Sequence, residues 1–237
     1  MSVRRPSSWR RALTISAYAA LTFGCSIFSN AAKVNYRVTV AIDGPEGKAS
    51  GSGVWSWRLE KPTAALATPY SGKFQGEAIP IELPGGRVVY AILRGRSGSH
   101  DMASMMPEHL FGDIGRSFRG EELLHGGDRI ADLRDIAGRL GERAEVPCDR
   151  HPSWCPMLVE FAEPGRAESV RRFDPAPGRR IAVSVEITDD DVTRGILTRL
   201  PWLPNYYDRM FDGSRSSALG KPLSNHLSQA EFSRGLK

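Results

Sequence analysis

Hydrophobic and polar residues alternate regularly in the first segment that predicts a folded structure. Every second residue from 34 to 42 is apolar, and the residues between them are mostly polar. This period of two is typical of a β-strand with one buried and one solvated face. A turn rich in glycine and proline follows at 43–47, after which Trp55, Trp57 and Leu59 share one face of a second strand. The two segments predict a β-hairpin.

Five further strands are predicted by alternation or by short apolar runs. They are expected at residues 72–83, 88–93, 157–162, 168–173 and 181–187. In the first of these, the apolar positions change phase between Phe74 and Ile79, which predicts a bulge or bend near Gly76. The second is an uninterrupted apolar run, which is typical of a strand covered on both faces.

Helical periodicity is strongest between residues 128 and 140. The apolar stripe of this segment consists of Ile130, Leu133, Ile136, Ala137 and Leu140. Such a stripe predicts an amphipathic helix that lies on the sheet. Asp128 is expected to cap its first turn, and Gly141 is expected to end it. A shorter helix is expected at 192–200, capped by the acidic run 189–191.

Aromatic residues and a capping signal mark the end of the chain. The aromatic residues are Trp202, Tyr206, Tyr207 and Phe211. We expect them to close one end of the sheet core, with a partner or carbohydrate surface as the alternative. Ser228 and Glu231 form a capping box, with Leu227 and Phe232 placed as a hydrophobic staple, which predicts a short terminal helix. The pattern leaves open whether that helix packs on this domain or on a partner.

These elements predict an α+β fold, mainly an antiparallel β-sheet or sandwich with one or two packed helices. The chain of 237 residues is divided into an export leader at 1–32, a single β-rich domain at 33–211 and a C-terminal tail with a short helix at 212–237. A domain of this length can bury one hydrophobic core.

The leader is predicted from four arginines, the absence of acidic residues and an apolar run too short for a membrane-spanning helix. Residues 21–25 resemble the lipobox of bacterial lipoproteins, which makes Cys25 the predicted site of lipid attachment. Leu21 and Phe23 depart from the usual positions of that motif. Cleavage near Ala31 or Ala32, or an uncleaved anchor, are the alternatives.

The positive charge of the chain is concentrated in this leader. The whole sequence has 32 lysines and arginines against 27 acidic residues, a formal net charge of +5. Without the four leader arginines the net charge is +1. The remaining balance gives no reason to expect a nucleic-acid partner.

Cys148 and Cys155 are the two cysteines outside the leader. In an oxidising compartment an isolated pair at this spacing predicts a disulfide that closes a small loop. The alternatives are free thiols and a metal site formed with His151, for which no fourth ligand is visible in the sequence. No metal ligand and no cofactor are therefore assigned.

Residues 94–127 show neither the alternation of a β-strand nor the apolar stripe of a helix, and they are predicted to be a long irregular loop. The loop and its flank contain His100, His109 and His125, together with Asp101, Asp113 and Asp128. We interpret the histidines as solvated loop residues. The alternative is a metal or hydrolytic site in which imidazole serves as ligand or general base. Its spacing matches no motif, so no catalytic residue is assigned.

Several segments resemble an uncharacterised family of exported proteins from Gram-negative bacteria, many with lipoprotein-type leaders. The resemblance begins with the Tyr-Arg-Val-Thr-Val strand at 36–40, the Gly-Pro-Glu-Gly turn at 44–47 and the Ser-Gly-Ser element at 50–52. Later segments at 157–161, 173–175, 183–189 and 200–203 extend it over most of the chain. It implies family membership and export, but no activity and no catalytic residue.

The sequence thus predicts an exported, periplasmic protein anchored to a membrane by lipid on Cys25, with a non-enzymatic binding or structural role. The expected partners are the membrane, through the lipid or the leader, and a protein, glycan or lipid component of the envelope. The alternative function is a hydrolase or metal-dependent enzyme that uses the segment 94–128, with His100, Asp101 and His109 as its residues.

Overall fold

A computed structural model describes residues 30–44, 47–61, 70–148, 150–174 and 180–235. The predicted leader through residue 29, including Cys25, lies outside the described residues. None of the helices within the described ranges has the length and apolarity needed to cross a membrane.

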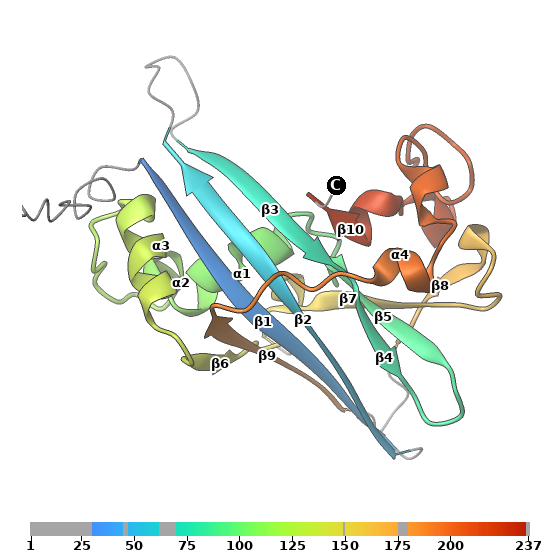
Figure 1. The fold of residues 1–237 in the computed structure, drawn as a ribbon, viewed down its shortest axis with the longest axis horizontal. Helices are drawn as coiled ribbons and strands as arrows, with labels where there is room; N and C mark the ends of the chain where they lie inside the picture. Colours follow the sequence, from blue (N-terminus) through green and yellow to red (C-terminus); the bar gives the residue numbers. More distant parts are fainter. Residues whose placement is uncertain (1–29, 45–46, 62–69, 149, 175–179, 236–237) are drawn as a thin grey trace, which may run out of the picture.

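The larger of the two sheets has six strands in the order β10-β3-β2-β1-β9-β6. Every pairing within it is antiparallel, and its long strands cross the middle of the molecule (Figure 1). Its strands in chain order are β1 (Ala31–Gly44), β2 (Gly47–Glu60), β3 (Ser71–Glu77), β6 (Arg143–Glu145), β9 (Arg180–Thr188) and β10 (Ser233–Arg234).

The smaller sheet has four strands in the order β4-β5-β7-β8, again paired antiparallel throughout. Its strands are β4 (Ile79–Glu82), β5 (Val88–Gly95), β7 (Pro156–Phe161) and β8 (Val170–Arg172). The two sheets and their accompanying helices confirm the predicted α+β fold dominated by antiparallel sheet.

The predicted N-terminal hairpin is confirmed, and so is the buried face of its first strand. In β1 the alternate residues 34 to 42 are all buried, while those between them are partly exposed. Tyr36 lies opposite Trp55 across the hairpin, and their rings meet edge to face at 6.1 Å. On its other side β1 pairs with β9, so that Val38 lies opposite Val185. The period of two therefore gives the buried face of the central strand correctly.

The strand predicted at 72–83 is two strands that belong to different sheets. The chain leaves the larger sheet after β3 and enters the smaller sheet at β4, with Ala78 between them. The Ala78 N–H donates to the Phe232 carbonyl at 2.8 Å, which holds the C-terminal segment at this break. Gly76 is buried because the Trp55 ring packs over it, and a Cβ there would lie 2.7 Å from that ring. The change of phase marks this change of sheet, and the bend predicted near Gly76 falls at Ala78.

The smaller sheet separates two hydrophobic cores. Val89, Ala91 and Leu93 of β5 point into the core shared with the larger sheet. Tyr90 and Ile92 point the other way, into a second core. This arrangement explains why β5 is a continuous apolar run and confirms that the strand is covered on both faces.

The C-terminal segment builds the far side of that second core. Phe211, Leu227 and Phe232 are buried in it. The capping box of Ser228 and Glu231 is present, although the helix it begins is a single 3₁₀ turn, Gln229–Glu231. Tail residues therefore pack on this chain and complete its fold.

The prediction that the aromatic residues at 202–211 close one end of the core is confirmed only in part. Phe211 closes the core as expected and meets the Trp202 ring at 5.5 Å. Tyr206 packs on the edge of the same core, whereas Tyr207 is 82 % exposed. The three remaining residues of this cluster, without Tyr207, form the predicted end of the core.

Four α-helices lie within the described ranges: α1 (Met102–Leu110), α2 (Asp113–Phe118), α3 (Arg129–Gly138) and α4 (Ile196–Arg199). Four further 3₁₀ turns lie at Pro152–Trp154, Ala167–Ser169, Leu203–Tyr206 and Leu223–Asn225. Helices α1, α2 and α3 gather at one end of the molecule, and α4 lies with the C-terminal segment at the other (Figure 1).

Helix α3 is the predicted amphipathic helix. The Asp128 carboxylate accepts hydrogen bonds from the backbone N–H groups of Ile130 and Ala131, as expected of the capping residue. Gly141 follows the helix with a φ of +81°, a conformation that suits glycine. The predicted stripe is one residue too long, because Leu140 lies beyond the helix and is exposed.

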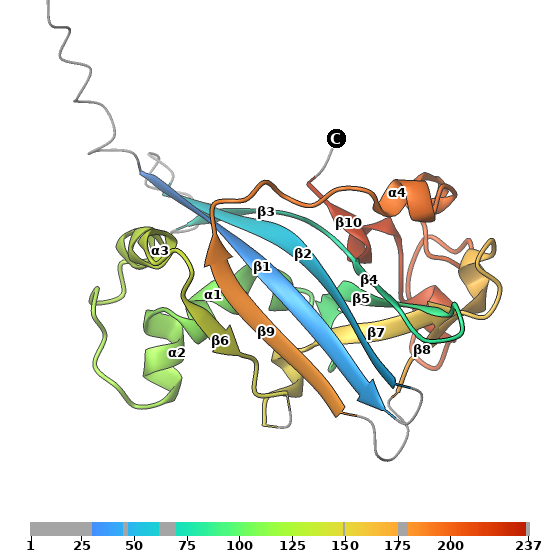
Figure 2. The same cartoon turned by 60° about the horizontal axis from the view of Figure 1, so that its bottom comes forward.

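Helix α4 is shorter than predicted and begins at Ile196, after Gly195 and not after the acidic run. Asp190 of that run instead pairs with Arg37 and accepts a hydrogen bond from Thr188. The chain between β9 and α4 crosses the outer face of the larger sheet (Figure 2), where the Thr193 N–H donates to the Val54 carbonyl at 3.1 Å. These contacts hold the acidic run against β1 and β9 and keep it out of the helix.

The segment predicted as an irregular loop contains α1 and α2, so that prediction is wrong. Most positions of α1 are buried, and a helix buried on most sides shows no apolar stripe. Pro107 lies inside α1 and has no N–H for the Ala103 carbonyl. The Tyr36 hydroxyl donates to that carbonyl instead. A side chain from the larger sheet thus replaces the hydrogen bond that the proline removes.

Replacing Tyr36 with phenylalanine is expected to lower the free energy of unfolding by about 1–3 kcal/mol. The Tyr36 side chain is fully buried, so its loss leaves the Ala103 carbonyl without a donor in an apolar environment. Urea denaturation measures the effect, with Tyr207→Phe as the exposed control. An unchanged midpoint in Tyr36→Phe would show that this hydrogen bond does not stabilise the fold.

Candidate functional site

A groove of about 910 Å³ opens where the ends of β1, β2 and β9 face β7 and β8. This volume lies in the range of sites that hold small molecules. The groove is lined by Ala41, Ile42, Asp43, Lys48, Ala49, Ser50, Arg96, Glu145, Val146, Pro147, Cys148, Arg150, Cys155, Pro156, Leu158, Arg172, Phe173, Arg180, Ile181 and Ala182.

Positive charge dominates the polar lining of the groove. The cations are Lys48, Arg96, Arg150, Arg172 and Arg180, and the anions are Asp43 and Glu145. Lys48 pairs with Asp43 at 3.3 Å, and Asp174 lies 3.3 Å from Arg172 and 3.9 Å from Arg96, so part of this charge is neutralised. Clustered cations beside a low-dielectric wall attract anions. The groove therefore has the electrostatic character of an anion-binding site.

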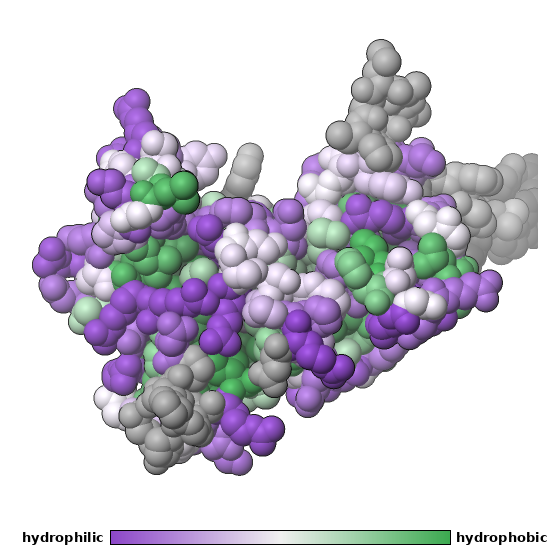
Figure 3. All heavy atoms as spheres, turned by 180° about the vertical axis from the view of Figure 1, so that it is seen from behind, coloured by the Kyte–Doolittle hydropathy of each residue, from purple (hydrophilic) through white to green (hydrophobic). Residues whose placement is uncertain are grey.

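The wall between these cations is apolar. Leu158 and Phe173 belong to the first hydrophobic core, and Ile181 packs against it; all three line the groove. Seen from behind, the molecule shows apolar surface between hydrophilic side chains (Figure 3). The arrangement suits a ligand that has both an anionic group and an apolar part.

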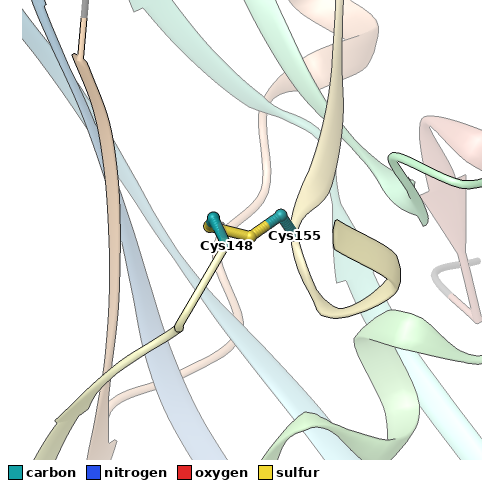
Figure 4. Close-up of a disulfide and its surroundings, with 2 residues drawn as sticks. All are labelled: Cys148 and Cys155. Carbon is teal, nitrogen blue, oxygen red and sulfur yellow. A yellow bond between two sulfur atoms is a disulfide. The ribbon is translucent and has the colours of Figure 1, made fainter. Parts of the chain in front are cut away.

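The predicted disulfide between Cys148 and Cys155 is present and lines the groove. Cys148 follows β6 of the larger sheet, and Cys155 precedes β7 of the smaller sheet (Figure 4). The bond therefore joins the two sheets at the edge of the groove. Because both sulfur atoms are in the disulfide, they supply no thiolates to the alternative metal site with His151. The His151 ring instead stacks on Trp154 at 4.4 Å.

Reduction of the disulfide is expected to lower the free energy of unfolding by about 2 kcal/mol. The bond closes a loop with a sequence separation of 7, and a short loop gains less from closure than a long one. Urea denaturation with and without reductant measures the difference. The double variant Cys148→Ala/Cys155→Ala serves as the control and should not respond to reductant. Equal stability of the wild type in the two conditions would contradict the prediction.

The histidines singled out in the sequence have different surroundings. The exposed His100 lies 3.7 Å from Glu231 in the C-terminal segment. His109 stacks on Trp154 at 4.5 Å and on Phe118 at 5.5 Å. Burial lowers the pKa of His109, and the nearby charges of His151 and Arg129 lower it further. Within the described part of the chain, His100 contacts the C-terminal segment and His109 contacts Trp154 and Phe118, so the geometry gives no support to their joint use as a hydrolytic pair.

Asp113 and His125 are brought together, and Asp132 of α3 joins them. One atom from each of these three side chains lies within 4.8 Å of the other two. Burial favours the neutral form of Asp113, but hydrogen bonds from the backbone N–H groups of His125 and Leu124 outweigh this and lower its pKa. Burial raises the pKa of Asp132, and the charge of Asp113 adds to that rise. Asp101 and Asp128 take no part, since Asp128 caps α3.

Glu108 is another buried acid in this region that the sequence pattern did not indicate. Its side chain is fully buried in α1, and Arg129 of α3 binds both of its carboxylate oxygens, at 2.9 and 2.6 Å. The Trp57 indole N–H donates to the same carboxylate at 3.3 Å. This pair connects two helices and the larger sheet, which is a structural role.

Sequence reasoning missed the groove and one member of the carboxylate and histidine cluster. The groove cations lie far apart along the chain, and only the pairing of β1 with β9 and the position of β7 bring them together. Asp132 lies on the predicted helix in a position that resembles any solvated acid. A scan for acidic residues that interrupt the buried side of a helix would have found it, since its neighbour Leu133 is fully buried.

In comparisons with protein-family models, with curated proteins and with solved structures, nothing matches this chain.

Proposed function

We propose that this chain is an exported, lipid-anchored binding protein of a Gram-negative cell envelope, and that its groove binds an acidic lipid. The observation that carries the binding role is the combination of five cations with an apolar wall in one groove of about 910 Å³. An acidic lipid has a matching anionic headgroup and acyl chains. An acidic glycan would satisfy the cations but would leave the apolar wall without a partner.

The compartment in this proposal is supported by the basic, short apolar leader, by the lipobox-like residues before Cys25 and by the resemblance to exported proteins. The disulfide is consistent with it, because such bonds persist in oxidising compartments. Lipid on Cys25 would hold the protein at a membrane, where acidic lipids are found. Within this proposal the groove serves binding, and the role is non-enzymatic.

Soluble short-chain lipids test the groove directly. Dihexanoyl phosphatidylglycerol and dihexanoyl phosphatidylcholine share their acyl chains and differ in net charge. Calorimetric titration of the wild type is expected to show about tenfold tighter binding of the phosphatidylglycerol, which corresponds to about 1.4 kcal/mol. Equal affinity for the two lipids, or binding of neither, would contradict the proposal.

A matched pair of variants locates the binding. Arg150→Glu/Arg180→Glu reverses two exposed cations of the groove and should abolish the preference for phosphatidylglycerol. Arg215→Glu/Lys221→Glu makes the same change of net charge at exposed residues of the C-terminal segment and should keep the preference. Loss of the preference in both variants would point to a general charge effect and away from the groove.

Mass spectrometry of the protein from its native membrane fraction tests the anchor separately. We expect a chain that begins at Cys25 and carries acyl mass, and we expect Cys25→Ser to move the protein out of the membrane fraction. An unacylated chain that begins near Ala32 would contradict the lipid anchor and leave the groove proposal intact.

A further inference from the structure

The geometry points to a metal site: we infer that Asp113, His125 and Asp132 together bind one divalent transition-metal ion. Asp113 belongs to α2, Asp132 to α3, and His125 to the segment between the two helices. The inference is independent of the proposed function, because it rests on a different part of the molecule.

The separations between the side-chain atoms support a shared ion. The His125 Nδ1 lies 3.4 Å from an oxygen of Asp132 and 3.7 Å from an oxygen of Asp113. These distances are long for hydrogen bonds. Two ligands of a tetrahedral zinc ion, with bonds of about 2.0–2.1 Å, lie about 3.3–3.5 Å apart. The separation from Asp132 has this value, the separation from Asp113 is slightly longer, and all three ligand atoms lie within 4.8 Å of one another, so small side-chain movements would let them share one ion.

The His125 Nδ1 is a buried nitrogen atom without a hydrogen bond among the described residues. A protonated imidazole held only by ion pairing would be expected to donate a hydrogen bond of ordinary length to one carboxylate. A metal ion satisfies the nitrogen and both carboxylates at once.

The groups around the three ligands hold them in place. The Asp113 carboxylate accepts from the N–H groups of Leu124 and His125, each at 2.8 Å. The Asp132 carboxylate accepts from the Asp113 N–H at 3.1 Å. On the far side of the imidazole, Nε2 lies 4.0 Å from Asp135. Metal-bound histidines commonly have a carboxylate near their second nitrogen, which fixes the ring orientation.

A cavity of about 340 Å³ reaches the two aspartates and gives a path for the ion. Its walls include Ile114, Phe118 and Leu123, and both aspartates line it. Apolar surface at this helical end of the molecule is visible among hydrophilic side chains (Figure 3). A site with three protein ligands and access from a cavity can keep one coordination position for water.

The donor set selects the class of metal. Two carboxylate oxygens and one imidazole nitrogen suit zinc, manganese or iron, whereas a calcium site would use oxygen ligands only. Bound metal would tie the segment 119–127 to α2 and α3. Zinc is the probe of choice because its binding can be measured without redox chemistry.

Calorimetric titration of the full chain with zinc chloride, after removal of metals by a chelator, tests the site. We expect one ion per chain and at least about tenfold weaker binding in His125→Ala. His100→Ala is the matched control, since His100 also lies 3.7 Å from a carboxylate but is largely exposed. Equal zinc affinity in the wild type and His125→Ala, or no binding by the wild type, would overturn the inference.

A second measurement needs no substitution and so avoids any folding defect of the variant. Nitrogen chemical shifts of the histidine rings in the wild type should change on addition of zinc, with the principal change at Nδ1 of His125. A principal change at His109 or His151 would place the ion elsewhere and overturn the assignment.

Discussion

Replacing Arg129 with methionine is expected to lower the free energy of unfolding by about 3–5 kcal/mol. The loss arises because Glu108 is fully buried and Arg129 binds both of its carboxylate oxygens. Methionine would leave a buried carboxylate without its cation, and the Trp57 N–H at 3.3 Å is a weak substitute. The effect should exceed that of any exposed ion pair in the molecule.

The double variant Glu108→Met/Arg129→Met separates loss of the charge pair from loss of packing. When both charges are removed no buried ion is left, so we expect it to recover most of the stability lost in Arg129→Met. Arg166→Met, which breaks an exposed pair with Glu163, is the control and should change little. Urea denaturation measures all three. A loss of less than about 1 kcal/mol in Arg129→Met, or no recovery in the double variant, would contradict this account.

Replacing Phe232 with alanine is also expected to cost about 3–5 kcal/mol, the range found for large aromatic residues in cores. The Phe232 side chain is fully buried and lies 5.4 Å from the Phe211 ring and 6.0 Å from the Tyr90 ring. Its backbone carbonyl also receives the Ala78 N–H at the break between the sheets. A cavity at this position would loosen the smaller sheet along with the C-terminal segment.

Thermal unfolding and urea denaturation measure this loss. Leu219→Ala is the control, because Leu219 is fully exposed on the same segment and should be near neutral. If Phe232→Ala were as stable as Leu219→Ala, the C-terminal segment would not belong to the cooperative fold. The second core would then depend on the smaller sheet and on α4 with the turn that follows it.

The sheet was predictable where one face of a strand meets a core and the other meets solvent. The alternation in β1 and the aromatic face of β2 reflect that simple environment. The sequence did not reveal that β3 and β4 lie in different sheets, because a change of sheet and a bulge produce the same change of phase. Helix α1 was not predicted for a related reason, because its burial on most sides removes the apolar stripe. Pro107 also disfavours a helix in the sequence, and only the structure shows that the Tyr36 hydroxyl replaces the hydrogen bond to the Ala103 carbonyl.

Local chemistry was easier to predict than chemistry assembled by the fold. The disulfide and the Asp128 cap are formed between residues close in the chain, so spacing alone indicates them. The groove cations and the approach of Asp132 to His125 depend on packing between separate elements. Contacts of this kind leave no periodic pattern in the sequence, since each residue on its own resembles an ordinary surface charge.

The central position of β1 also determines the order in which the molecule can assemble. Its pairing with β2 joins neighbouring segments of the chain, whereas its pairing with β9 brings Thr188 to Asn35, so β9 is expected to dock after the hairpin has formed. Until then the second edge of β1 has no partner, and an open strand edge is a template for association between chains. Pairing over such a sequence distance is also slow. The docking of β9 on β1 is therefore the step at which association between chains competes with folding.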